Sequence, residues 1–135
     1  LGRPGDARGI APLIAALSDP KWRVAARARD SLAEIGSPAV PALVATLSNA
    51  AQSSASFYAQ QALTRIGTSA VPALMSAART GNVEARQRAV LVLGAIGDSR
   101  AVDLLKSLST SDSIPAIRQA AERALKQVQE GRRIG

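Results

Sequence analysis

The side chains that could carry chemistry in this chain are carboxylates, guanidiniums, amines and hydroxyls, because it contains no His and no Cys. His is the commonest general base and metal ligand at neutral pH, and Cys supplies thiolate chemistry. The best carboxylate pair for acid–base work is Asp30 and Glu34, four residues apart on a predicted helix. Arg23, Arg27 and Arg29 lie beside that pair, so we interpret it as a ladder of solvated ion pairs.

No phosphate-binding motif is present, since neither GxxxxGK[ST] nor GxGxxG occurs in the sequence. No nucleophile lies at a spacing that would pair it with a base, and metal sites built from scattered Asp residues have no support in the pattern. The sequence therefore predicts a protein that is not an enzyme, with no catalytic residue, no metal and no cofactor.

Binding is the function that the remaining residues favour. Phe57, Val90 and Leu91 are apolar at positions that a helical wheel turns toward solvent, and contiguous exposed apolar groups indicate an interface. The alternative is that curvature or neighbouring helices cover them. Trp22 is interpreted as a packed lid rather than a binding residue. The predicted partner-binding residues are Arg29, Phe57, Tyr58, Gln60, Gln61, Val90, Leu91 and Arg123.

A repeat of about 31 residues must position these side chains. Gly5, Gly36, Gly67 and Gly97 are separated by 31, 31 and 30 residues, and an Ile precedes each of the last three. Each unit reads as two helices. The first has apolar residues at i, i+3, i+4 and i+7, as in Ile10, Leu13, Ile14 and Leu17, and the second carries Ala and aliphatic residues on one face. The second-helix stripe of the first unit is predicted as Val24, Ala28, Ser31, Leu32 and Ile35.

The residues between the helices agree with this division. Each Gly can close a helix in the left-handed region, and the next residue, Asp6, Ser37, Thr68 or Asp98, can cap the following helix. Pro41 and Pro72 lie deeper, so the first helix should bend or start late. The second unit is the least regular, with a long polar turn predicted over Asn49 to Ser56.

The units resemble HEAT repeats, most closely the short phycobilisome-lyase-like variety. The resemblance rests on the Ala-Val-Pro-Ala-Leu runs at 39–43 and 70–74, the second helices at 86–93 and 118–125, and the Ile-Gly closures. It implies an all-α, right-handed α-solenoid of about four stacked helix pairs, with the second helices on the concave face. It also implies that Arg86 and Arg118 are structural and bond to turn aspartates of their own or a neighbouring repeat. Asp19 and Asp112 hold that turn position, and the incomplete set of partners argues against a continuous polar ladder.

The predicted repeats cover about 6–36, 37–67, 68–97 and 98–130 of one domain, 1–130. Residues 1–5 align with the end of an upstream repeat, which suggests a fragment of a longer array, and 131–135 are predicted as a tail. Exposed Ile10 and Leu13 at the first repeat would favour self-association. No leader or spanning segment is recognised, and a cytoplasmic location is expected.

The resemblance and the residues together predict a protein–protein interaction scaffold that binds a partner on its concave face. One alternative is nucleic-acid binding through distributed Arg, because the net charge is +7. The charge is spread at +1 or +2 per unit rather than gathered in a stripe, which argues against that alternative. The other alternative, which rests on the resemblance, is a subunit similar to the bilin lyases.

Overall fold

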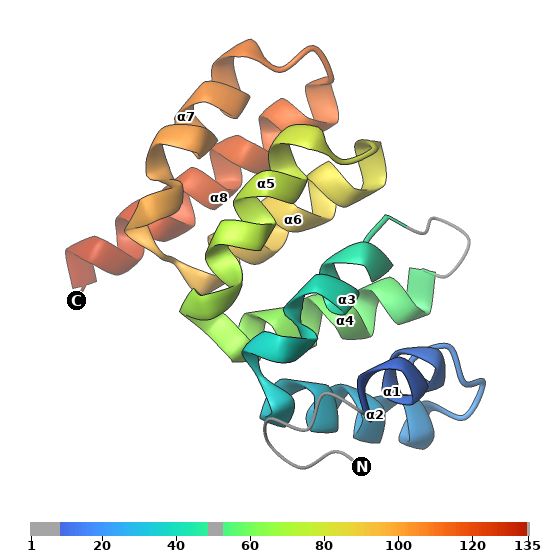
Figure 1. The fold of residues 1–135 in the computed structure, drawn as a ribbon. Helices are drawn as coiled ribbons and strands as arrows, with labels where there is room; N and C mark the ends of the chain where they lie inside the picture. The colour runs from blue at the N-terminus through green and yellow to red at the C-terminus, as the bar shows by residue number, and fades with distance from the viewer. Residues whose placement is uncertain (1–8, 49–52, 135) are drawn as a thin grey trace.

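The computed structural model describes residues 9–48 and 53–134, and every regular element in them is a helix. The first helices of four successive pairs are α1 (Ile10–Ala16), α3 (Val40–Thr46), α5 (Val71–Thr80) and α7 (Val102–Ser111). The second helices are α2 (Trp22–Ile35), α4 (Ser53–Ile66), α6 (Val83–Ile96) and α8 (Pro115–Ile134). Each pair stacks on the next (Figure 1), which confirms the prediction of an all-α solenoid of four helix pairs.

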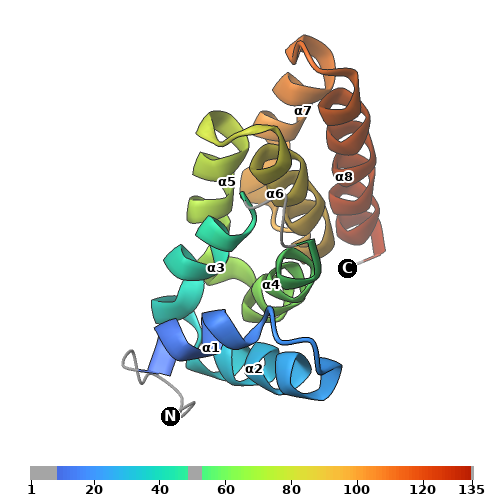
Figure 2. The same cartoon turned by 90° about the vertical axis from the view of Figure 1, so that its right-hand side faces the viewer.

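The helices form two rows, one of first helices and one of second helices (Figure 2). Neighbouring second helices contact one another more extensively than neighbouring first helices do. We call the row of second helices, α2, α4, α6 and α8, the inner row, because its helices pack more closely against one another. The inner row therefore has one helix from each of the four described repeats.

Leucine and alanine at equivalent repeat positions build the core. Leu32, Leu63 and Leu93 hold the same place in three successive second helices, and all are buried. Burying each Leu stabilises the fold by about 2 kcal/mol. An Ala one helical turn before this position in each second helix lets neighbouring helices of the inner row approach each other closely. These alanines are Ala28, Ala59, Ala89 and Ala121, all buried.

A glycine with a positive φ follows each of α2, α4 and α6, as predicted, but Gly97 has the predicted left-handed conformation (ψ 17°) whereas Gly36 does not (ψ −136°). Gly36, Gly67 and Gly97 have φ values of 79°, 80° and 79°, a region that other residues rarely adopt. A short 3₁₀ turn then leads into the next first helix, at Ser37–Ala39, Gly67–Ala70 and Ser99–Ala101. Because of these turns, Pro41 and Pro72 fall in the first turn of α3 and α5, where no backbone bond is lost. The predicted late start of the first helix is confirmed.

Only part of the predicted capping is found. The Asp98 side chain accepts a hydrogen bond from the Arg100 backbone N–H at 2.8 Å and so caps the 3₁₀ turn. Ser37 and Thr68 were predicted to cap in the same way and this is wrong, because each lies inside its 3₁₀ turn, one residue past the cap position for Ser37 and two for Thr68. Asp6, the fourth predicted cap, lies outside the described residues.

Polar contacts join the second and third repeats across their turns. The Asn82 side chain donates to the Ser48 carbonyl at 2.9 Å, and Arg88 donates to the Leu47 carbonyl at 2.6 Å and to Ser56 Oγ at 3.1 Å. Both carbonyls lie just past the C-terminal end of α3, where backbone acceptors have no partner within the helix. Residues 49–52 of the predicted long turn lie outside the described residues, and 53–56 are helical rather than turn.

Two further predictions differ from the structure. Val24 was placed on the buried stripe of α2, yet it is exposed, because no described helix pair packs on that side of the first repeat. Its counterpart Ala55 is buried against the preceding pair. Residues 131–134, predicted as a tail, continue α8 as its last turn, since Gly131 lies within the helix and does not end it.

Candidate functional site

A pocket of about 480 Å³ opens on the inner row, across α2, α4 and α6. It spans the first three repeats, so its shape depends on how these helices stack. Most of its wall is contributed by α4 and α6. The lining residues are Arg29, Phe57, Gln60, Gln61, Thr64, Arg65, Leu91, Val92 and Ala95.

Two large apolar side chains are exposed at this pocket. Phe57 on α4 is 55% exposed and Leu91 on α6 is 44% exposed. The Phe57 ring meets the edge of Tyr58 at 5.9 Å between centroids, and Tyr58 packs against the core. Phe57 thus contacts the half-buried Tyr58 while about half of its own surface stays exposed at the pocket.

A polar network joins α2 and α4 beside these apolar groups. Arg29 donates to Asp30 Oδ1 at 3.0 Å and to Gln61 Oε1 at 2.6 Å, and its guanidinium lies 5.6 Å from the centre of the Tyr58 ring. Arg65 donates to the same Asp30 oxygen at 2.6 Å. Both Arg side chains line the pocket, and one carboxylate serves both.

The electrostatic state of the network follows from Asp30. The hydrogen bond from Arg29, followed by that from Arg65, lowers the pKa of Asp30 below its ordinary value. Asp30 is thus ionised at neutral pH and balances one of the two guanidiniums. The predicted ladder of Asp30 and its neighbours is in fact a bridge between two repeats.

The structure brings five of the predicted partner-binding residues to this pocket and places three elsewhere. Arg29, Phe57, Gln60, Gln61 and Leu91 line it. Tyr58 lies behind Phe57 and is half-buried, and Arg123 is exposed on α8, outside the pocket lining. Val90 was expected at the surface and this is wrong, since it is fully buried.

Close packing of α6 explains the error at Val90. This helix is covered by α4 on one side and by α8 on the other, so it has two buried faces instead of the one stripe assumed by a helical wheel. Gly94 shows how tight the α8 side is, because a Cβ there would lie 2.8 Å from the Cα and the Cβ of Ala124. Arg65, Val92 and Ala95 were missed by the sequence reasoning; Arg65 could have been found as the residue four after Gln61.

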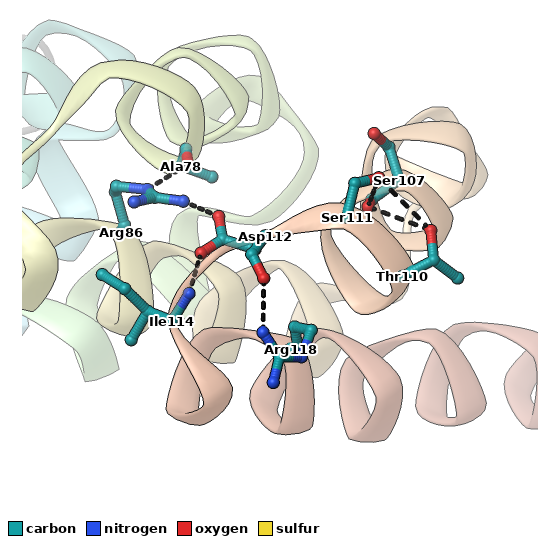
Figure 3. Close-up of polar contacts among 8 residues, drawn as sticks. All are labelled: Ala78, Arg86, Ser107, Thr110, Ser111, Asp112, Ile114 and Arg118. Carbon is teal, nitrogen blue, oxygen red and sulfur yellow. Dashed lines mark hydrogen bonds and ion pairs between the residues drawn. The ribbon is translucent and has the colours of Figure 1, made fainter.

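A second polar cluster surrounds Asp112, in the turn between α7 and α8 (Figure 3). Its carboxylate pairs with Arg86 of the preceding repeat and accepts the Ile114 backbone N–H at 2.9 Å. Arg86 also donates to the Ala78 carbonyl at 3.2 Å, and Arg118 donates to the Asp112 carbonyl at 2.6 Å. The hydroxyls of the nearby Thr110 and Ser111 donate to the Ser107 carbonyl within α7, at 3.3 and 2.8 Å, and also contact each other.

This cluster clarifies the role predicted for the two arginines. Arg86 and Arg118 both bond to the turn, as expected for structural residues, but the carboxylate takes the arginine of the neighbouring repeat rather than that of its own. In the first repeat, Asp19 instead accepts the Lys21 backbone N–H at 2.8 Å and holds its own turn. Contacts between repeats therefore differ in kind from one junction to the next.

The first repeat also carries exposed apolar surface. Trp22 is 65% exposed with Arg23 at 5.3 Å from its ring centre, so the prediction of a packed lid is wrong. A hollow of about 450 Å³ lies between α1 and α2, and Leu13 and Val24 line it. Self-association at this end stays a prediction.

The described residues lack two kinds of feature. They hold no group of three or more His, Cys, Asp or Glu side chains that could bind a metal ion. None of their helices combines the length and apolar character needed to cross a membrane.

Comparisons with known proteins agree with the geometry. A family model described as HEAT repeats matches residues 40–126. The solved structure of human deoxyhypusine hydroxylase in complex with glycerol is similar at a TM-score of 0.63 and 25% identity, covering 95% of this chain and 46% of that chain. The present sequence thus spans about half of the hydroxylase structure, and no curated protein matches it. On the extent of the family match, this chain belongs to the HEAT-repeat family.

Proposed function

We propose that this chain is a non-catalytic scaffold that binds a partner protein at the inner-row pocket. The observation that carries the proposal is the pair Phe57 and Leu91, exposed on adjacent second helices around one pocket of about 480 Å³. Leaving large apolar side chains in water forfeits about 1.5 to 3 kcal/mol each, which a partner recovers by covering them. Interfaces commonly centre on such aromatic and aliphatic anchors within a polar rim.

A second candidate is an enzymatic role, favoured by the likeness to a hydroxylase. The scaffold is preferred because the chain has no His and no Cys, and because the pocket lining offers no carboxylate. The charged groups that line it, Arg29 and Arg65, are guanidiniums, which donate hydrogen bonds and offer no acceptor for a proton. They are suited to holding a partner.

Partner capture with pocket variants tests the scaffold. The full chain is immobilised and exposed to lysate of its source organism, beside Phe57→Ala, Leu91→Ala and the control Lys126→Ala on the exposed face of α8. A captured protein is then purified and titrated by calorimetry. We expect each pocket variant to weaken binding by about 30-fold, as hot-spot truncations of about 2 kcal/mol do, and the control to leave it unchanged.

Circular dichroism melts keep the result interpretable, because substitutions at half-exposed positions should change stability little. Equal affinity for all four proteins would show that the pocket is not the interface. Capture that disappears after nuclease treatment would instead favour the nucleic-acid alternative.

A further inference from the structure

Positive side chains outnumber negative ones at the inner-row pocket. Arg29 and Arg65 line the pocket, while Asp30, which bonds to both, lies outside the lining. Both bonds go to the same oxygen, Asp30 Oδ1. Two positive charges therefore share one negative charge, and the excess faces the pocket.

The two arginines differ in how firmly they are held. Arg29 is fixed by Asp30, Gln61 and the Tyr58 ring. Arg65 is 53% exposed and uses one N–H of Nη1 on Asp30. A guanidinium has five N–H donors in a planar fork, so Arg65 retains an edge that can take a second carboxylate.

The apolar anchors lie within the same pocket as this free edge. Phe57 and Leu91 line it from α4 and α6, and Arg65 follows Phe57 by two helical turns on α4. A bound segment can thus cover the apolar pair and reach Arg65 at once. A Lys or Arg on that segment would meet Arg29 and Arg65, and like charges brought together in an interface oppose binding.

We infer that the partner presents an acidic segment, in which an aromatic or aliphatic side chain enters between Phe57 and Leu91 and a neighbouring carboxylate bonds to Arg65. This inference rests on the proposed function, since it assigns the chemistry of the partner at the same pocket. The net charge of +7 adds a long-range attraction for an acidic segment.

A display selection with a random dodecapeptide library tests the inference on the full chain. Clones are counted as pocket-bound when they are lost on both Phe57→Ala and Leu91→Ala. Among these, we expect Asp or Glu within two positions of an aromatic or aliphatic residue. Pocket-bound clones with neutral or basic neighbours would overturn the acidic partner and leave the scaffold standing, whereas the absence of pocket-bound clones would count against the proposed function itself.

Binding of one selected peptide then isolates the Arg65 contact. Its acid is changed to the amide, and Arg65 is changed to Gln, with affinities read by fluorescence anisotropy. We expect each single change to weaken binding about tenfold and the two together to weaken it no further, as a shared charged hydrogen bond requires. Lys126→Gln, at a position 68% exposed on α8, is the matched loss of one positive charge and should change nothing.

Two outcomes would overturn the assignment of the carboxylate. One is an affinity for the acidic peptide that does not change when Arg65 is replaced with Gln. The other concerns a single-stranded oligothymidine of about 15 nucleotides, the length that a basic groove commonly covers. If it binds more tightly than the selected peptide and loses affinity on Arg65→Gln, the Arg65 edge binds phosphate rather than carboxylate.

Discussion

Asp98 shows how one side chain can both end a turn and join two repeats. Its carboxylate accepts the Arg100 backbone N–H and the Arg100 guanidinium, with bonds of 2.8 to 3.2 Å. Arg100 in turn donates to the Thr68 carbonyl of the preceding repeat at 2.8 Å. The Arg100 bonds lower the pKa of Asp98 below its ordinary value. A lowered pKa in the folded state means that the ionised carboxylate stabilises the fold.

Replacing Asp98 with Asn should remove that contribution in a pH-dependent way. Because the folded-state pKa is the lower one, the contribution is present above the unfolded pKa of about 3.9 and is lost as the pH falls through the folded-state value. We expect Asp98→Asn to lower the free energy of unfolding by about 0.5 kcal/mol at pH 7, since the pair is near the surface and Asn still caps.

Urea unfolding of both proteins from pH 7 down to pH 2 measures this difference, which should narrow toward the acid end. Glu34→Gln on α2 is the control for the loss of one negative charge. A difference between the parent chain and the Asp98→Asn variant that stays constant with pH would contradict the role given to the carboxylate.

At the scale of the element, α6 separates what the sequence can predict from what it cannot. The four-residue spacing of Ala89 and Leu93 predicts the helix, and Gly97 predicts its end, because both signals are local in the sequence. The burial of Val90 depends on α8 packing against the second face, which is a property of the assembled row. Likewise, Phe57 and Leu91 could be marked as apolar and outward from the sequence, but the pairing of Arg29 with Gln61 required the stack.

The junction between α6 and the turn before α8 gives a prediction at this scale. Arg86 pairs with Asp112, whose side chain is only 5% exposed, so removing either partner leaves a poorly solvated charge. We expect Arg86→Ala and Asp112→Ala each to destabilise the fold by about 2 to 3 kcal/mol, with a coupling energy of about 1 to 2 kcal/mol in the double-mutant cycle.

The exposed pair Glu122 and Lys126 on α8, 3.8 Å apart, is the matched control, and its coupling should be below about 0.5 kcal/mol. Chemical denaturation of the parent and variant proteins in the two cycles gives both values. Additive effects at Arg86 and Asp112 would show that the pair does not link the third and fourth repeats.

At the scale of the whole molecule, stability is a sum over repeats and the contacts between neighbours. The helices with extensive contacts belong to the same repeat or to adjacent ones, so the buried cluster of the described residues, from Leu17 to Val128, is built up from layers between neighbours. The scarcity of aromatics, 2% of the residues, follows from this design, because thin Ala and Leu layers fill the space between close helices. The pocket lies across three repeats and therefore depends on junctions that the sequence of one repeat does not describe.

The two ends of the stack should differ in how much they contribute to the free energy of unfolding. Contacts of α8 with α6 and α7 are the most extensive in the described residues, whereas α1 contacts its neighbours much less. A chain ending at Gly97 loses the α8 cover of Val90, and a chain beginning at Ser37 loses the smaller α1–α2 pair. We expect both to unfold at lower urea concentration than the full chain, and the chain ending at Gly97 to be the less stable by several kcal/mol. Circular dichroism at low protein concentration, with light scattering to confirm monomers, measures the order, and equal midpoints for all three chains would rule out a stack held by nearest-neighbour contacts.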